Sequence, residues 1–510
     1  MPPLLDALAF DLQRSGGAPL HRQIQSRLVA EITAGALKPG ARLPSSRALA
    51  ELLGVSRNTV MLVFEQMIAE GYLDGQTGSG TYVSRSLPGL DRKARPAPRI
   101  NPVLPAASSL DRGRSFARFS DVPETFRRMR RPVAFRANFP AVDAFPVQLW
   151  AKLTMNLFRR MDASAASHLL GEGDPQGYHP LRECIAQHLA LSRGVHCSAA
   201  NVVIFAGVQH AADTACRLLL MPGDRAWCED PGYDGAYAAI TAASAHPCPV
   251  PVDEQGIDVA AGLAAFPDAR FAYVTPSKQY PLGMAMSLER RTQLLDWAKA
   301  HDSWIIEDDY DSEFRYGGRP LPPLQALDTE GRVIYLGTFS KSLFPALRLG
   351  YAVVPDALIE YFVAARTVVG RYSPILDQIL VANFMAEGHF AAHVARMRKL
   401  YVQRQAALLE AVARDLGDYM TAEPSDSGME LLATLRPGFD AIAIARAAAA
   451  EGLEVMPVSF HTQGQRPDPR LLLGFGAFTL AQIDDGARHL RWVISGMTPQ
   501  CNIASGSMVR

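Results

Sequence analysis

The chain has few of the features that mark secreted or membrane proteins. Its six cysteines among 510 residues include no CxxC pair, which fits reduced thiols in a cytosol better than a disulfide framework. No run approaches the roughly 18 apolar residues that a membrane helix needs, and residues 1–6 lack the charged start and apolar core of a signal peptide. We therefore expect a cytoplasmic protein without a structural disulfide, a membrane segment or a metal site.

An excess of charge of one sign is also absent. The chain carries 51 basic and 51 acidic residues, and residues 1–84 likewise contain equal numbers of each sign. Charge count alone therefore gives no attraction to nucleic acid. Any affinity for DNA has to come from how the charges are arranged.

Length and composition indicate more than one domain. A chain of 510 residues exceeds the size at which one hydrophobic core stops growing. We expect an N-terminal domain over residues 1–84, a basic linker rich in proline and arginine over 85–131, and a large domain over 132–500. As a coil this linker would span about 40 Å. Its arginines could contact phosphates, or could simply keep a solvated linker soluble.

The N-terminal domain has the pattern of a winged helix-turn-helix. Apolar residues recur at helical spacing from Leu20 to Ile32 and again from Val60 to Ile68. Between these stretches, residues 45–56 contain a capping serine, a short helix, a glycine turn and a second capping serine. Two short segments follow, at 71–73 and 78–83, and they read as the strands of a wing.

In this pattern the second helix of the motif would enter the major groove of DNA. Arg57, Asn58 and Thr59 at its start carry the groups that read base edges, although Arg57 could instead be a solvated helix arginine. Phosphate contacts would position the domain. The predicted DNA-binding residues are Arg42, Ser45, Ser46, Arg47, Ser56, Arg57, Asn58, Thr59, Gly80 and Thr81.

The large domain reads as an α/β fold with a mostly parallel sheet. Short, continuously apolar segments indicate strands buried on both faces, and helical stretches such as 287–301 separate several of them. Ligands of such sheets collect at the carboxyl ends of the strands. The expected strands are 202–205, 226–228, 271–274, 304–306, 333–336 and 351–354.

A lysine, a carboxylate and a phenol follow two of these strands. Lys341 comes after an apolar strand and a turn of small residues, and Arg348 stands seven positions later. Another apolar strand runs into Asp308 and Tyr310. This set can hold a carbonyl cofactor that carries a phosphate. The sequence therefore predicts a pyridoxal phosphate Schiff base at Lys341, because a surface lysine would leave the neighbouring hydroxyl residues and Arg348 unexplained.

Motifs in both domains resemble known families. Pro39-Gly-Ala-Arg-Leu-Pro-Ser-Ser46 and Val55-Ser-Arg-Asn-Thr-Val60 resemble the winged helix-turn-helix of the GntR family. Five segments of the large domain resemble a fold type I aminotransferase, in sequence order: Gly177-Tyr-His-Pro-Leu-Arg182, Glu229-Asp-Pro-Gly-Tyr233, Thr275-Pro-Ser-Lys-Gln-Tyr-Pro-Leu-Gly283, Glu307-Asp-Asp-Tyr-Asp-Ser-Glu-Phe314 and Gly337-Thr-Phe-Ser-Lys-Ser342. Over nearly the whole chain, the combination resembles the MocR/GabR group of bacterial transcription regulators.

The resemblance implies roles at the cofactor. Lys341 would form the Schiff base and Tyr310 would hydrogen-bond the ring hydroxyl. Asp308 would face the pyridine nitrogen, with Asp309 as the alternative if the register differs by one. Tyr233 would stack on the ring. A helix N-terminus after strand 202–205 would hold the phosphate. The remaining expected cofactor contacts are Gly207, Val208, Gln209, Tyr280, Thr338, Ser340 and Arg348.

Four positions depart from the pattern of the related proteins. Tyr280 stands where common aminotransferases have asparagine, and Lys278 stands where the regulators often have histidine. Glu172 replaces a tyrosine that approaches the phosphate of the neighbouring subunit, so it is left out of the expected site. Gly235 stands where the GABA-responsive member has an arginine for its effector's carboxylate, which makes GABA a poor candidate as ligand.

Two functions follow from the resemblance. In the first, a homodimeric regulator of promoter DNA senses an amine or amino acid effector through the cofactor aldimine, with residual transamination at most. In the second, the chain is a working aminotransferase with a DNA-binding head. The attached DNA-reading domain favours the regulator. Arg470, with Arg466 as its rival, is the candidate for a carboxylate of the effector.

Overall fold

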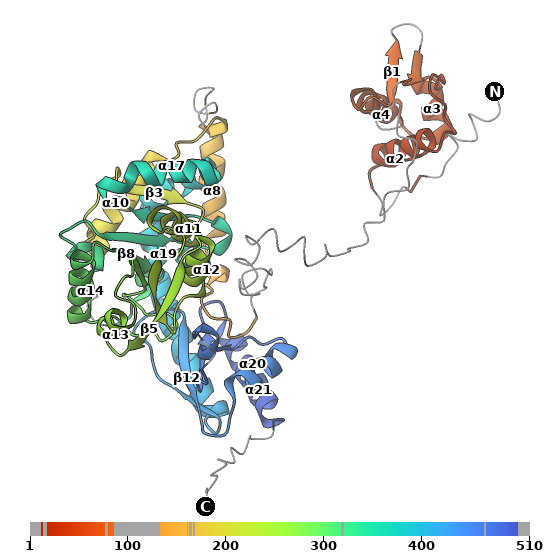
Figure 1. Ribbon diagram of the computed structural model, residues 1–510. Helices are drawn as coiled ribbons and strands as arrows, with labels where there is room; N and C mark the ends of the chain where they lie inside the picture. Colours follow the sequence, from red (N-terminus) through yellow and green to blue (C-terminus); the bar gives the residue numbers. More distant parts are fainter. Residues whose placement is uncertain are drawn as a thin grey trace, which may run out of the picture. The chain divides into compact units, whose positions relative to one another are not determined.

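The computed structural model describes residues 12–13, 18–76, 80–85, 133–160, 162, 166, 169–317, 321–463 and 466–497. The chain divides into two compact units, residues 1–112 and 113–510 (Figure 1). The linker expected over 85–131 lies almost entirely outside the described residues. Among the described residues, none of the helices has both the length and the apolar character that crossing a bilayer requires.

The first unit, called the head from here on, is a winged helix-turn-helix, as predicted. Among the described residues, its core consists of apolar side chains from α2, α3, α4, β1 and β2, including Leu28, Leu49, Val60, Leu73 and Val83. Strands β1 and β2 pair antiparallel, and β1 begins two residues later than the sequence indicated. The elements are α2 (Leu20–Thr33), α3 (Ser46–Leu53), α4 (Arg57–Ala69), β1 (Leu73–Gln76) and β2 (Gly80–Val83).

The second unit, the body, is built on an eight-stranded sheet of order β3-β10-β9-β8-β7-β4-β5-β6. Strands β5, β4, β7, β8 and β9 run parallel, whereas β10 is antiparallel to both of its neighbours. The predicted mostly parallel sheet is therefore confirmed. The strands are β3 (Val202–Phe205), β4 (Arg225–Asp230), β5 (His246–Asp253), β6 (Gly256–Ile257), β7 (Phe271–Val274), β8 (Trp304–Asp309), β9 (Val333–Thr338) and β10 (Gly350–Val353).

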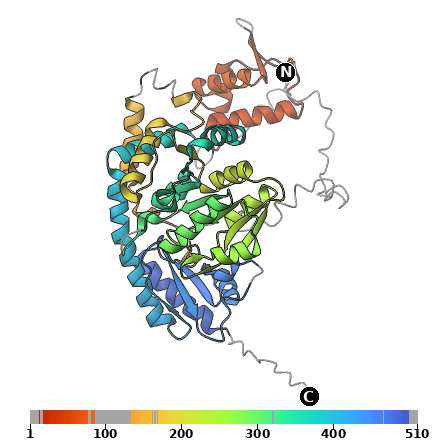
Figure 2. The same ribbon diagram turned by 60° about the vertical axis from the view of Figure 1, so that its left-hand side comes forward.

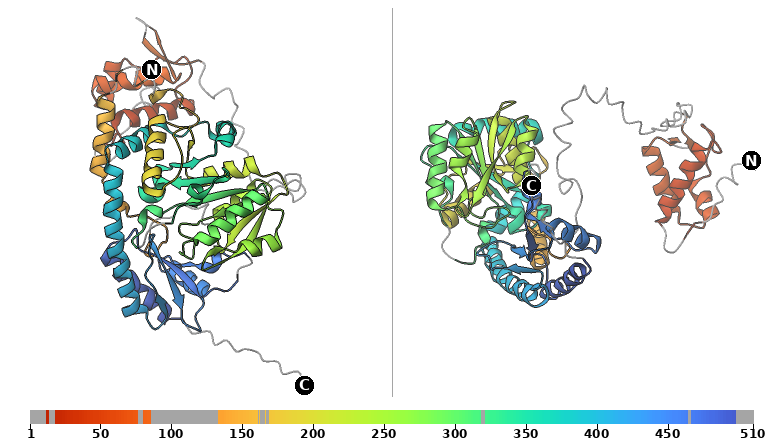
Figure 3. Two further views of the ribbon diagram at one scale, coloured as in Figure 1. Left: turned by 90° about the vertical axis from the view of Figure 1, so that its left-hand side faces the viewer. Right: turned by 60° about the horizontal axis from the view of Figure 1, so that its bottom comes forward.

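Helices cover both faces of this sheet (Figures 1 and 3). Alternate side chains of β3 show the two faces: Val203 and Phe205 belong to one core cluster, and Val202 and Ile204 to another. This double burial explains the continuous apolar strands. The helices are α8 (Val147–Arg159), α10 (His179–Arg193), α11 (Val208–Leu219), α12 (Asp234–Ala242), α13 (Val259–Ala265), α14 (Leu288–Ala300), α15 (Leu324–Leu327), α16 (Phe339–Ser342), α17 (Ile359–Gly370), α18 (Ile375–Ala386) and α19 (His389–Ala411).

A second, four-stranded antiparallel sheet of order β11-β12-β14-β13 forms a small domain at the C-terminal end of the body. Helix α19 runs along the body from the large sheet to this small one (Figure 2). The segment that opens the body pairs with the small sheet through Phe135 and Gly474. The elements are β11 (Met420–Ala422), β12 (Glu430–Leu435), α20 (Ala441–Ala450), β13 (Met456–Pro457), the 3-10 turn η6 (Val458–His461), β14 (Arg470–Gly474) and α21 (Leu480–Ser495).

Candidate cofactor and DNA-binding sites

The structure brings all of the expected cofactor residues into one cavity of 430 Å³. They come from β8 and β9 and the residues that follow them, from the N-terminal end of α11, and from the loops after β7, before α12 and before β10. Residues expected from sequence that line this cavity are Gly207, Val208, Gln209, Tyr233, Tyr280, Asp308, Tyr310, Thr338, Ser340, Lys341 and Arg348. Residues more than a hundred positions apart in the sequence therefore meet at one edge of the sheet, as expected for an α/β fold.

Lys341 lies in the short helix α16, which follows β9 directly. The Thr338 hydroxyl accepts a hydrogen bond from the Ser340 N–H at 3.1 Å and so caps this helix. The Lys341 Nζ donates a hydrogen bond to the backbone oxygen of Asn138 at 2.6 Å. Burial lowers the pKa of Lys341, against the opposing influence of Glu430 and Asp311. A lysine with a lowered pKa carries more of the neutral amine that attacks a carbonyl.

Asp308 and Tyr310 present buried oxygen atoms to the cavity. The Tyr273 hydroxyl donates to Asp308 Oδ2 at 2.6 Å, but among the described residues Asp308 Oδ1 and Tyr310 Oη have no hydrogen-bond partner. Burial raises the pKa of Asp308 to about 7. Buried polar atoms are normally paired. A pyridinium N–H and a ring hydroxyl are groups that would pair with these two oxygens, so the residues fit pyridoxal phosphate.

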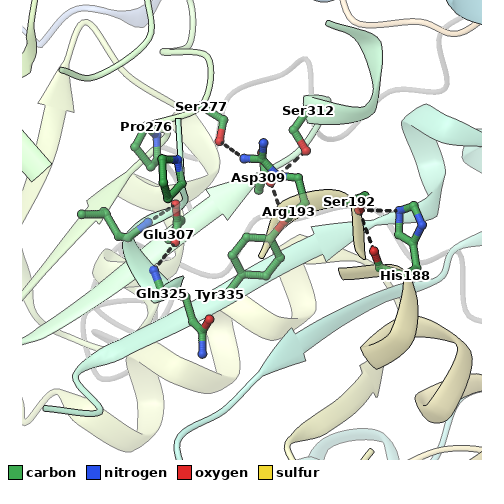
Figure 4. Close-up of polar contacts among 12 residues, drawn as sticks. His188, Ser192, Arg193, Pro276, Ser277, Glu307, Asp309, Ser312, Gln325 and Tyr335 are labelled. Atoms are coloured by element: carbon green, nitrogen blue, oxygen red, sulfur yellow. Dashed lines mark hydrogen bonds and ion pairs between the residues drawn. The ribbon is translucent and has the colours of Figure 1, made fainter. Parts of the chain in front are cut away.

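Asp309 does not line the cavity, and three side chains donate hydrogen bonds to its Oδ2 atom (Figure 4). The Arg193 Nε donates to Asp309 Oδ2 at 3.0 Å and the Ser312 hydroxyl donates at 2.8 Å. The Tyr335 hydroxyl donates to the same oxygen. Asp309 is thus a structural carboxylate, and of the two neighbouring aspartates it is Asp308 that reaches the cavity.

The N-terminal end of α11 is the candidate phosphate-binding part of the cavity. Gly207 caps α11 with a φ of 103°, a left-handed conformation that favours glycine. The backbone N–H groups of Val208 and Gln209 are in the first turn of that helix, where the helix dipole attracts anions. The Arg348 guanidinium is adjacent, because a Cβ atom added to Gly207 would lie 3.6 Å from Arg348 Nη2. A phosphate would meet both a positive side chain and free backbone donors here.

The cavity also contains residues that the sequence did not single out. Arg136, Asn138 and Phe139 come from the segment that opens the body, and Glu454, Met456 and His461 come from the small domain. The Tyr280 hydroxyl lies 3.1 Å from His461 Nε2, so the two domains of the body meet across the site. No sequence motif pointed to these residues, because their segments become neighbours only when the small sheet packs against the large one.

Three of the departures from the related proteins have a structural explanation. Lys278 is buried away from the cavity, where it pairs with Asp311 and Glu430. Glu172 pairs with Arg371 at 2.9 Å, which offsets its charge. Any side chain at Gly235 would collide with the Tyr233 ring and with Gln209. This position therefore has no room for the arginine of the GABA-responsive member.

The structure does not bring Arg470 to the cavity. Its backbone pairs with Thr434 at the start of β14, and its guanidinium forms an ion pair with Asp468 at 2.6 Å. Arg466 does not line the cavity either; its side chain is exposed and lies 3.9 Å from Asp230. The expectation that Arg470 grips a carboxylate is therefore not supported, because the side chain is already neutralised outside the site.

In the head, the predicted DNA-binding residues gather around the N-terminal ends of α3 and α4. The Ser45 and Ser56 hydroxyls cap these helices by accepting from the Ala48 and Thr59 N–H groups, both at 3.2 Å. The Arg57 Nε donates to the Ser46 hydroxyl at 3.4 Å, which links the two helix starts.

The wing contacts the segment that leads into α3. Arg42 forms a β-bridge with Tyr82, and its side chain lies beside Gly80, whose φ is 117°. Arg42, Arg47, Arg57 and Asn58 are at least partly exposed. The turn of the wing before Gly80 lies outside the described residues.

Comparisons with known proteins match both parts of the chain. Residues 133–490 match the aminotransferase class I and II family, and residues 20–83 match the gntR family of bacterial regulatory proteins. The chain is 38% identical over 487 residues to the probable rhizopine catabolism regulatory protein MocR of Rhizobium meliloti, covering 94% of each protein. It is 34% identical over 450 residues to the HTH-type transcriptional regulator TauR of Rhodobacter capsulatus, covering 88% of this chain and 91% of TauR.

Among solved structures, LysN of Thermus thermophilus is similar to the body. This α-aminoadipate aminotransferase, complexed with N-(5'-phosphopyridoxyl)-L-leucine, aligns with a TM-score of 0.68 and 27% identity over 76% of this chain and 98% of LysN. The aminotransferase likeness thus stops short of the head, whereas the likeness to the regulators spans both parts. The chain therefore belongs to the MocR-type group of GntR transcriptional regulators, in which a helix-turn-helix head precedes a body with the aminotransferase class I and II fold.

Proposed function

We propose that this regulator binds pyridoxal phosphate at Lys341 and uses it to sense a primary amine or an amino acid. The observation that supports the proposal is that the groups lining the cavity match those of pyridoxal phosphate. It combines the amine of Lys341, an anion site at the start of α11 beside Arg348, and the two buried oxygens of Asp308 and Tyr310 that have no protein partner among the described residues. The related LysN structure holds a phosphopyridoxyl group joined to an amino acid, which is the kind of ligand that these residues would bind.

Each residue of the cavity would contact a different part of the cofactor. When bound, pyridoxal phosphate supplies an aldehyde that condenses with amines and a ring that withdraws electrons. Lys341 would hold the aldehyde carbon, and Asp308 would keep the proton at the pyridine nitrogen. Tyr310 would donate a hydrogen bond to the ring oxygen. Tyr233, whose hydroxyl donates to Gln209 at 3.1 Å, would cover one face of the ring.

The effector would enter between the large sheet and the small domain. Arg136 lines this part of the cavity together with Asp234, Glu454 and His461. If the effector carries a carboxylate, Arg136 is placed to meet it, whereas Arg470 is not. GABA remains a poor candidate, because the position of Gly235 has no room for an arginine.

Regulation would result when effector binding in the body alters how the head binds promoter DNA in the cytoplasm. A gel-shift assay on the DNA upstream of the regulator's own gene, with and without pyridoxal phosphate, tests this. Absorbance and borohydride reduction test the cofactor directly: the wild type should give a band that disappears in Lys341→Ala while the thermal unfolding curve persists. Wild-type protein that stays colourless and forms no borohydride-stable adduct would refute the proposal.

A working aminotransferase is the second candidate, because Lys341, Asp308 and Tyr310 are residues that this reaction would use at the cofactor. Turnover assays with a panel of amino donors separate the two functions. Sustained turnover by a protein that does not bind promoter DNA would favour the enzyme. Promoter binding that responds to the cofactor, with little or no turnover, would favour the regulator.

We also propose that the body forms a homodimer. Large apolar side chains are exposed on α8 and α17, among them Met155, Phe158, Val368 and Val369, and Val368 is 88% exposed. A cavity of 550 Å³ lies between α8 and α18 and contains none of the expected cofactor residues. Clustered exposed apolar side chains are typical of a protein interface. We infer that a second copy of this chain covers them, because most soluble oligomers are symmetric assemblies of identical chains.

A further inference from the structure

The backbone of Asn138 is held at both its carbonyl oxygen and its N–H group. Its carbonyl oxygen accepts from Lys341 Nζ at 2.6 Å, and its N–H donates to Glu430 Oε2 at 3.2 Å. Asn138 has a φ of 59°, the left-handed region that asparagine tolerates. The first contact comes from α16, which follows β9 of the large sheet, and the second comes from β12 of the small sheet. Asn138 therefore spans the two domains of the body beside the cofactor lysine.

Glu430 is itself held in place. Its other oxygen, Oε1, accepts from Lys278 Nζ, and Lys278 also donates to Asp311 Oδ2 at 3.1 Å. All three side chains are buried, with at most 4% of each residue exposed. Gly428 leaves the space for this cluster, because a Cβ atom there would collide with Lys278 Nζ. A buried carboxylate with both oxygens engaged makes a rigid anchor.

We propose that the hydrogen bond from Lys341 Nζ to the Asn138 carbonyl is present when Lys341 is a free amine and absent when Lys341 is bonded to the cofactor. Glu430 is the positioning residue that holds the Asn138 backbone within reach of Lys341. The inference rests on the proposed function, because it requires Lys341 Nζ to form a double bond to the cofactor carbon. A free amine has hydrogens to donate to Asn138. A nitrogen in a C=N bond carries one hydrogen at most and is held in the plane of the bound ring, so the Asn138 carbonyl loses its donor.

An amine that takes the cofactor carbon restores the contact. The incoming nitrogen forms the new C=N bond, the bond between Lys341 and that carbon breaks, and the two hydrogens of the incoming amine end on Lys341 Nζ. Nothing is oxidised or reduced. The described chain of the body begins at Val133, five residues before Asn138, and the segment that leads to the head precedes it in the sequence. Arrival of an amine would therefore tighten the backbone close to where the chain enters the body.

Hydrogen exchange measured by mass spectrometry tests the inference on the full-length protein. Peptides that cover residues 135–141 are compared without cofactor, with pyridoxal phosphate, and with pyridoxal phosphate plus aminooxyacetate, an amine that removes the aldehyde from lysine. We expect slow exchange, then exchange roughly tenfold faster, then slow exchange again, as for one hydrogen bond lost and regained. Absorbance of the same samples reports whether the double bond to Lys341 forms.

Variants separate a positioning role from a merely structural one. Glu430→Ala should exchange fast in all three states, and Glu430→Gln, which keeps an acceptor for the Asn138 N–H, should recover most of the difference between states. Arg291→Met is the matched control, because Arg291 is a buried cation with its own carboxylate partner, Glu307, at 3.8 Å. It should lower stability and retain the three-state pattern.

Two failures are distinguishable in this experiment. If absorbance shows no double bond, the proposed function is wrong. If the double bond forms and exchange over 135–141 is the same in all three states of the wild type, the inference about Asn138 is wrong while cofactor binding stands. The wild-type comparison decides even if Glu430→Ala does not fold.

Discussion

Asp308 and Asp309 are adjacent on β8, and their side chains face opposite sides of the large sheet. Asp308 lines the cofactor cavity with one oxygen that no described residue pairs. Asp309 accepts hydrogen bonds from Arg193, Ser312 and Tyr335 on the other side. The alternation of a strand thus assigns two identical residues to two different tasks.

Matched substitutions of these two aspartates should separate cofactor binding from stability. Asp308→Asn removes the charge that would face the pyridine nitrogen and should weaken pyridoxal phosphate binding by about 1.5–3 kcal/mol, as measured by absorbance titration. Asp309→Asn should leave the affinity nearly unchanged. It should instead lower the free energy of unfolding by about 3 kcal/mol, because it leaves Arg193 buried without its counterion. An equal loss of cofactor affinity in both variants would contradict this assignment.

The stability of the cofactor-free protein should depend on pH through Asp308. Burial raises the pKa of Asp308 to about 7, whereas a carboxyl of this type has a pKa of about 3.9 in an unfolded chain. A group with a raised pKa stabilises the fold fully at pH values below the unfolded pKa, and that contribution is lost as pH rises through the folded pKa. The melting temperature should therefore fall between about pH 4 and about pH 7, the range from the unfolded to the folded pKa.

Two comparisons check this dependence by thermal unfolding. Asp308→Asn should fall less than the wild type over the same pH range, with a remainder because burial also raises the pKa of Glu229 and of Glu307 to about 7. Pyridoxal phosphate should reduce the fall in the wild type, since a protonated ring nitrogen stabilises the Asp308 carboxylate. Identical slopes for the variant and the wild type would show that Asp308 does not cause the effect.

Arg57→Ala should weaken binding to the promoter fragment by about 1–3 kcal/mol if Arg57 contacts a base. The Arg57 side chain is exposed at the start of α4, beside the Ser46 hydroxyl. Arg27→Ala is a suitable control, since Arg27 is an exposed arginine on α2 that pairs with Glu31. Fluorescence anisotropy with labelled DNA measures both. Unchanged affinity after Arg57→Ala would remove Arg57 from the residues that read DNA.

Val368→Glu should disrupt the proposed dimer, because it places a charge on the exposed apolar surface of α17. Sedimentation velocity should show a shift toward the monomer at micromolar protein. Met221→Glu is the control, because Met221 is an equally apolar, 71% exposed residue away from the proposed interface. It lies just beyond the C-terminal end of α11, whereas Gly370 at the end of α17 lies near His210, at the N-terminal end of α11. A monomeric wild type, or a variant that remains dimeric, would contradict the proposed interface.

Much of the cofactor site was predictable because each motif is local. Lys341 follows its strand within a few residues, and the same holds for Asp308 and Tyr310 after the apolar start of β8. Buried strands are apolar on both faces, so they stand out in the sequence, and parallel strands align their carboxyl ends. The capping serines and the glycine turn located the helices of the head in the same local way.

The tertiary structure alone decided which residues complete the site. Asn138, Glu430 and His461 come from segments without a motif, and they join the surroundings of Lys341 and Tyr280 only because the small sheet packs against the large one. Arg470 is the opposite case: the sequence predicted that it binds a carboxylate of the effector, but it pairs with Asp468 and does not line the cavity. Short-range patterns determine strands, turns and caps, but contacts across hundreds of residues depend on domain packing, which no local pattern records.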